Sequence, residues 1–238
     1  MRKFLFVASI LALASAGSSA FAKDAGRVLR WAEGLPGCTF SADEDGSYRY
    51  GFWTDDFGII MAVDADELRK ASHRAEPTFA VLLTVRYRGK ASLPVEPDGI
   101  SLEFVNHDHD THPAIAPDAL SAALRQDSDK VVEQAEREIR KHPEKKVEQG
   151  SILQENEKSL KAAIDFVKTQ GLVATQLDST HLQASGWVFF SAKSKWIGDW
   201  KKQEEFVLRV PIGGETVEFP FALPPSQGDL ILRRRPNQ

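Results

Sequence analysis

Apolar and polar residues alternate with a period of two over much of the chain, and this pattern predicts β-strands. In residues 100–105, for example, Ile100, Leu102 and Phe104 alternate with polar positions, so one face of this segment should be buried. Asp45-Gly46 and Gly213-Gly214 separate such runs in the way that hairpin turns do. We expect the main strands at residues 38–42, 47–54, 57–63, 79–88, 100–105, 186–191, 205–210 and 216–221.

The pattern changes to a helical period between residues 117 and 170. Two apolar stripes at spacings of three, four and seven indicate two helices, with Pro143 interrupting the pattern after His142. Ser151 with Gln154 predicts the start of the second helix, and Gly171 predicts its end. Such helices either fold back as a hairpin or form one kinked helix along the sheet. The stripes consist of Leu120, Leu124, Val131, Ala135 and Ile139, and then of Leu153, Leu160, Ile164 and Val167.

The order of these elements predicts the fold class. Strands and helices do not alternate regularly, which argues against a parallel sheet of βαβ units. Seven or more short strands with one helical insertion are typical of an antiparallel β-sandwich. We therefore predict an α+β protein that is mainly β, with a single β-sandwich domain over residues 23–238 and a helical insertion at residues 117–170.

The strands after the helices also resemble a known family. Residues 182–190 (LQASGWVFF) place a glycine before an aromatic strand, and residues 206–210 (FVLRV), Gly213-Gly214 and residues 217–221 (VEFPF) follow as a hairpin. This arrangement is similar to the C-terminal half of exported bacterial immunoglobulin-like domains. The resemblance implies an immunoglobulin-like antiparallel sandwich that binds partners or supports larger assemblies, and it implies no reaction.

The first 22 residues have the pattern of a cleaved secretory signal. Arg2 and Lys3 precede an apolar run at residues 4–13, and Ala20-Phe21-Ala22 supplies small residues at the two positions that a signal peptidase recognises. The apolar run is shorter than the roughly 20 residues that cross a bilayer. We expect cleavage after Ala22, a periplasmic or secreted protein, and no integral membrane span.

The charge balance of the chain limits the kinds of partner that we expect. The formal charge is −4, and loss of Arg2 and Lys3 would bring it to −6. An acidic chain argues against nucleic acid or an anionic membrane as the main partner, because both attract a positive field. Cys38 is the single cysteine, so no intramolecular disulfide can form, and we expect this small residue to be buried.

A histidine-rich segment is the first candidate site. Residues 106–113 read NHDHDTHP, and in an extended segment His107 and His109 would project to the same side. Two such imidazoles can share zinc or another divalent transition metal, with His112 as a third ligand. The alternative is an ordinary polar loop between a strand and a helix.

Two tryptophans form the second candidate site. Trp196 and Trp200 lie among four lysines in residues 192–202 (AKSKWIGDWKK). Exposed aromatic side chains of this kind stack on sugars or enter protein grooves. The alternative is that both rings fold back onto the edge of the sandwich.

No enzyme motif accompanies these candidates. The chain has no G-x-S-x-G, H-E-x-x-H, P-loop, C-x-x-C or G-x-G-x-x-G sequence. We predict a non-enzymatic envelope protein without a cofactor, which binds an envelope protein or a glycan through the helical insertion or the tryptophan loop. A periplasmic metal-binding protein is the first alternative, and a polysaccharide-cleaving enzyme with two carboxylates is the second.

Overall fold

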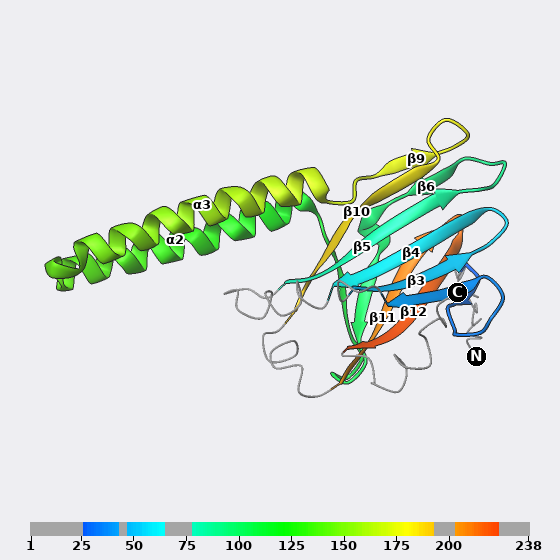
Figure 1. The fold of residues 1–238 in the computed structure, drawn as a ribbon, viewed down its shortest axis with the longest axis horizontal. Coiled ribbons are helices and arrows are strands. Elements are labelled where there is room, and N and C mark those ends of the chain that lie inside the picture. The colour runs from blue at the N-terminus through cyan, green and yellow to red at the C-terminus, as the bar shows by residue number, and fades with distance from the viewer. Residues whose placement is uncertain (1–25, 43–46, 65–77, 193–202, 224–238) are drawn as a thin grey trace, which may run out of the picture.

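The computed structural model describes residues 26–42, 47–64, 78–192 and 203–223, and these residues form a mainly β fold with two long helices (Figure 1). The helices are α2 (Pro117–Lys141) and α3 (Lys146–Gln170), and the short 3-10 turns are η1 (Pro97–Gly99) and η2 (Pro143–Lys145). The strands of the described residues are β1 (Val28–Arg30), β2 (Cys38–Ala42), β3 (Ser47–Trp53), β4 (Phe57–Asp64), β5 (Thr78–Tyr87), β6 (Leu93–Val95), β7 (Ser101–Phe104), β8 (Asp110–Ile115), β9 (Thr175–Leu177), β10 (Gln183–Ser191), β11 (Glu204–Ile212) and β12 (Glu215–Leu223).

One curled sheet contains ten of these strands, in the order β1-β12-β11-β7-β8-β10-β5-β4-β3-β2, and β6 pairs separately with β9. Strand β8 is the point at which the sheet turns. Its first four residues pair with β7, whereas Ala114 and Ile115 pair with Phe190 and Phe189 of β10. The two halves of the sheet can therefore face each other while remaining hydrogen-bonded through β8.

The sheet is mixed, and here it differs from the antiparallel arrangement that the sequence predicted. β1 runs parallel to β12, with Val28 opposite Thr216 and Arg30 opposite Glu218. The backbone N–H of Trp31 extends this pairing by donating to the carbonyl of Glu218 at 2.8 Å. The alternation pattern missed β1 because a three-residue strand is too short to establish a period.

The core fills the space between the two halves of the sheet. Aromatic rings of β3 and β5 contact rings of β11 and β12, with centroid distances of 6.5 Å for Phe52–Phe219 and 5.1 Å for Phe79–Phe206. Phe79, Phe206 and Phe219 are at most 1% exposed. Ring pairs at these separations add to the stabilisation that comes from burying their apolar area.

The helices form an antiparallel hairpin that projects from one end of the sheet (Figure 1), and we call residues 117–170 the arm. The hairpin was one of the two arrangements that the helical pattern allowed. The predicted end of α3 at Gly171 is confirmed, whereas its predicted start at Ser151 is wrong. α3 begins at Lys146, directly after η2, and the Ser151 hydroxyl donates to the Val147 carbonyl inside the helix at 3.2 Å. Gly171, which follows the last residue of α3, has an extended conformation, with φ of −65°.

Candidate functional site

The arm is held together by a narrow seam between α2 and α3. On α2 the most buried seam residues are Ser121, Ser128 and Ala135, which are small and seven residues apart. The side-chain amide of Asn156 donates to the Ser128 hydroxyl at 2.7 Å and fixes which residues of α3 face which residues of α2. The opposite faces of both helices are charged and exposed. Most of the arm surface is therefore available for contact with another molecule.

The base of the arm packs on the outer face of β10. Leu120 of α2 and Val167 of α3 form an apolar cluster with Phe189, and all three are at most 7% exposed. Phe166 lies against Trp187, with ring centroids 6.0 Å apart. This cluster anchors the arm to the sheet, because burial of such side chains contributes about 1.5–3 kcal/mol each.

The chain that leaves α3 crosses closely over β10. Leu172 donates its backbone N–H to the Trp187 carbonyl at 2.9 Å. A Cβ atom on Gly186 would lie 2.5 Å from the nitrogen of Leu172, so only glycine allows this approach. The two ends of the arm are also neighbours, since a Cβ atom on Gly171 would lie 3.2 Å from Cγ of Pro117. The arm thus enters and leaves the sheet at one place.

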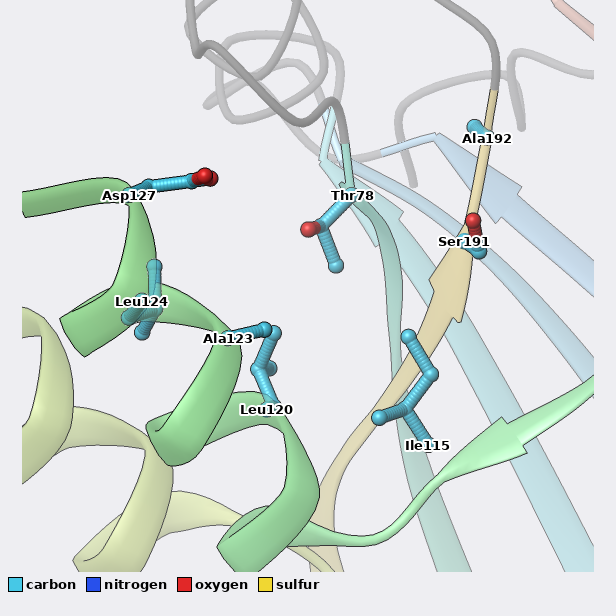
Figure 2. A pocket seen from close by; sticks show the side chains of 8 residues that line it. All are labelled: Thr78, Ile115, Leu120, Ala123, Leu124, Asp127, Ser191 and Ala192. Carbon is cyan, nitrogen blue, oxygen red and sulfur yellow. The ribbon is translucent and has the colours of Figure 1, made fainter. Parts of the chain in front are cut away.

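A small cavity of about 270 Å³ lies between the base of α2 and the ends of β5 and β10 (Figure 2). Its apolar walls come mainly from Ile115, Leu120 and Leu124. Figure 2 shows the polar side chains of Asp127, on α2, and Thr78, on β5, pointing toward one another. Asp127 also accepts a hydrogen bond from the Lys130 ammonium group at 2.7 Å. The cavity is therefore partly polar and belongs to the junction between arm and sheet.

The histidine-rich segment forms a tight turn and not the extended segment that the sequence suggested. Asp108 and His109 both have left-handed backbones, with φ of 56° and 58°, and Asp110 donates its N–H to the His107 carbonyl at 3.1 Å. Aspartate and histidine tolerate this conformation better than most residues other than glycine. We call residues 107–112 the histidine turn. Its geometry prevents His107 and His109 from projecting to the same side.

The three histidines of this turn contact different carboxylates. Nε2 of His107 lies 3.2 Å from the Glu204 carboxylate, and Nε2 of His112 lies 3.3 Å from the Asp110 carboxylate. Both rings also face Phe104, with centroids 6.5 and 5.2 Å away. Nδ1 of His109 instead lies 2.5 Å from the Glu103 carboxylate on the other face of the sheet. Within the described residues, no three His, Cys, Asp or Glu side chains form a group that could hold a metal ion.

Glu103 is part of a row of charges across the outer face of the sheet. Its carboxylate pairs with Arg209 of β11, which in turn donates from Nε to Glu218 of β12 at 3.0 Å. Arg30 of β1 lies 3.1 Å from the same Glu218. Burial would raise the pKa of Glu103, but the hydrogen bonds from His109 and Arg209 and their charges outweigh it and lower the pKa. Strand pairing brings these residues together from distant parts of the sequence, so spacing alone could not reveal them.

The structure describes only some of the remaining residues that the sequence singled out. Trp196 and Trp200 lie outside the described residues, and so does Asp45-Gly46. Cys38 is a half-buried free thiol at the margin of the main core. In the part of the chain that the structure describes, no helix is long and apolar enough to cross a membrane.

Comparison with known proteins finds no match to this chain among family models, curated proteins or solved structures. The function must therefore be argued from the residues and their geometry.

Proposed function

We propose that the protein is an exported, non-enzymatic binding or scaffolding protein of the cell envelope, and that it contacts its partner through the arm. The single observation that carries the proposal is the projection of the arm from the sheet (Figure 1). Of the described arm, only the base packs on the sheet, through side chains that include Leu120, Phe166 and Val167. The remainder of both helices contributes nothing to the core of the sheet, so the protein can use it for contact with another molecule.

The composition of the arm supports a role outside the core. α2 and α3 have 25 residues each, but the structure buries only four side chains of α2 and two of α3. Long helices that bury so little gain limited stability from packing, because most helical stability in proteins comes from tertiary contacts. Binding of a partner is a physical reason for a chain to maintain such helices.

Export and the immunoglobulin-like relationship are part of the same proposal. Export is supported by the basic, apolar and A-x-A pattern of the first 22 residues. The immunoglobulin-like relationship is supported by the β11–β12 hairpin, which turns at Gly213 and Gly214 with φ of 59° and 81°. Domains of that kind mostly bind partners, which agrees with a role in recognition.

A shortened arm tests the proposal. The bond from Asn156 to Ser128 implies that Val131 faces Leu153, so residues 132–152 can be replaced by a short glycine-rich turn without a change of register. This variant keeps the base and the junction with β10. We expect it to remain folded, as judged by cooperative unfolding in denaturant, and to recover at least one envelope partner in much smaller amount. A variant of the sheet, Thr84→Ala, is the control, because Thr84 is a half-buried residue of β5 outside the arm and its hydroxyl lies 2.8 Å from that of Ser185.

Equal recovery of every envelope partner by the full chain and the shortened-arm variant would overturn the proposal. A partner lost equally from the Thr84→Ala control would also contradict it, because the contact would then depend on the sheet.

A further inference from the structure

The tip of the arm, residues 140–146, concentrates positive charge. Arg140 and Lys141 end α2, and Lys145 and Lys146 lie at the start of α3. All four side chains are exposed, and Glu144 is the one acidic residue between them. The formal charge of the tip is therefore +3. Since the whole chain carries −4, the rest of the chain carries −7.

Helix stability accounts for only two of the four cations at the tip. Arg140 and Lys141 lie at the C-terminal end of α2, where cations interact favourably with the helix dipole. Lys145 and Lys146 lie at the N-terminal end of α3, where the dipole disfavours them. Glu144 approaches His142, at 3.2 Å, and none of the four cations forms an ion pair with another described residue. The sequence thus maintains two cations that weaken the helix to which they belong.

The arm separates the tip from the charges of the sheet. Leu124 is the last residue of α2 in the cluster with the sheet, and Lys141 at the tip lies 17 positions further along the helix. At 1.5 Å per residue this distance is about 25 Å. The Debye length at physiological salt is about 8 Å, so the tip is largely screened from the charges of the sheet. The net charge of the chain, which argued against anionic partners, does not describe the field at the tip.

We propose that the tip binds the anionic phospholipid headgroups of a bilayer surface. This inference rests on the proposed function, since it assigns a partner to the same arm. The tip is a convex end, and no tip residue lines the described cavities at the arm base or the sheet margins. A bilayer presents charge over a flat area and needs no matching pocket, so four long basic side chains can reach it at once.

An apolar residue beside the cations supports a lipid partner over an acidic protein. Val147 follows Lys146 and is 84% exposed, the highest value among the exposed large hydrophobic side chains of the described residues. An apolar side chain at the edge of a basic cluster can enter the boundary between headgroups and acyl chains. Glu138 and Glu148 flank the cluster further from the end of the arm. The binding is therefore a surface contact by the end of the arm, without insertion of a helix.

Two charge-matched variants of the full chain test this proposal. The tip variant is Arg140→Gln/Lys141→Gln/Lys145→Gln/Lys146→Gln. The control variant is Arg125→Gln/Lys158→Gln/Lys161→Gln/Lys168→Gln, which also removes one arginine and three lysines from exposed positions of α2 and α3. Both variants have the same net charge and keep the same N-terminal segment and the same arginines at 233–235. Any difference between them therefore comes from the position of the charges on the arm.

Co-sedimentation with vesicles gives the readout. Each vesicle sample contains either phosphatidylcholine alone or equal parts of phosphatidylglycerol and phosphatidylcholine. Because each basic residue near such a surface strengthens binding about fivefold, we expect the tip variant to bind the anionic vesicles at least about tenfold more weakly than the full chain, and the control variant within about threefold of it. Val147→Ser alone should also weaken the binding of the full chain to the anionic vesicles.

Equal binding of the two variants to anionic vesicles would overturn the lipid proposal, and so would equal binding of the full chain to both kinds of vesicle. The recovery of envelope partners separates this failure from failure of the proposed function. If the two charge variants bind anionic vesicles equally while the shortened arm loses a protein partner, the lipid proposal is wrong and the proposed function stands. If the shortened arm loses neither vesicles nor partners, both proposals are wrong.

Discussion

The indole nitrogen of Trp31 donates a hydrogen bond of 3.2 Å to the backbone carbonyl of Thr39. Trp31 follows β1 and Thr39 lies in β2, and these strands are the two edges of the ten-stranded sheet. The Trp31 ring also packs edge-on against Tyr50, with centroids 5.0 Å apart. One side chain therefore links the first and the last strand of the curled sheet and covers part of an edge that could otherwise pair with another chain.

Loss of this link should destabilise the fold. Trp31 is 5% exposed, so Trp31→Phe removes a buried donor and part of the ring contact with Tyr50. We expect the free energy of unfolding to fall by about 1–3 kcal/mol, as measured by urea denaturation. Trp187→Phe is the control, because Trp187 is only half-buried against Phe166, and it should change stability less. Equal effects of the two substitutions would show that the hydrogen bond to Thr39 contributes nothing.

The row of charges on the outer face of the sheet predicts that the stability of the fold depends on pH. The pKa of Glu103 is lower in the folded protein than its ordinary value of 4.5, because hydrogen bonds from His109 and Arg209 outweigh the effect of burial. A lowered carboxyl pKa stabilises the fold above the unfolded value, and this contribution disappears as the pH falls through the folded value. Glu103→Gln should therefore lower stability by about 1–3 kcal/mol near neutral pH and by progressively less below pH 4.5.

Denaturation of both proteins at a series of pH values, with a carbon NMR titration of the Glu103 carboxyl, checks this prediction. A Glu103 pKa above 4.5 would contradict it, since burial would then dominate over the two hydrogen-bond partners. Asp178 provides an internal comparison. Its carboxylate accepts hydrogen bonds from the side chain of Thr180 and from two backbone N–H groups, and these lower its pKa to about 2.

Two glycines should respond in opposite directions to the same substitution. Gly186→Ala places a Cβ atom 2.5 Å from backbone of Leu172 and should lower stability by more than about 2 kcal/mol, because backbone atoms cannot move aside easily. Gly150→Ala lies inside α3 with nothing within 4 Å of the new methyl group. It should raise stability by about 0.5–1 kcal/mol through helix propensity. Thermal unfolding of both variants measures the difference, and an unchanged melting temperature for Gly150→Ala would show that this part of α3 does not contribute to global stability.

The structure limits the metal hypothesis for the histidine turn to two of its three histidines. His107 and His112 face the same ring, that of Phe104, whereas His109 lies with Glu103 on the other face. If the natively purified protein binds zinc at this turn, calorimetric heats should disappear in His107→Ala and His112→Ala and remain in His109→Ala. Absence of bound metal together with unchanged heats in all three variants would exclude the turn as a metal site.

The sequence predicted most of the strands and both helices because their signals are local. β3, β4, β5, β10, β11 and β12 lie within a few residues of the expected positions, and Pro143 separates the two helices as its chemistry requires. The start of α3 was displaced by five residues. Pro143 is compatible with the first turn of a helix, so η2 leads into Lys146 without the predicted cap at Ser151.

Features that depend on long-range pairing could not be found in this way. β8 begins within a segment that has the composition of a loop, and its two different partners β7 and β10 make the sheet turn. Glu103 and Arg209 are 106 positions apart in the chain, and only the pairing of β7 with β11 brings them together. The sequence shows the four cations of the tip. It does not show that they lie far from the sheet, because this separation depends on the arm being a hairpin.

The neighbouring positions of Pro117 and Gly171 have a consequence for how the arm can vary. Because both ends leave the sheet together, the length of the arm is independent of every strand pairing. Adding seven residues to each helix would move the tip about 10 Å outward and preserve the seam, since its small residues already repeat every seven positions. The arm therefore behaves as a spacer of adjustable reach, and its length sets the distance between the sheet and whatever the tip touches.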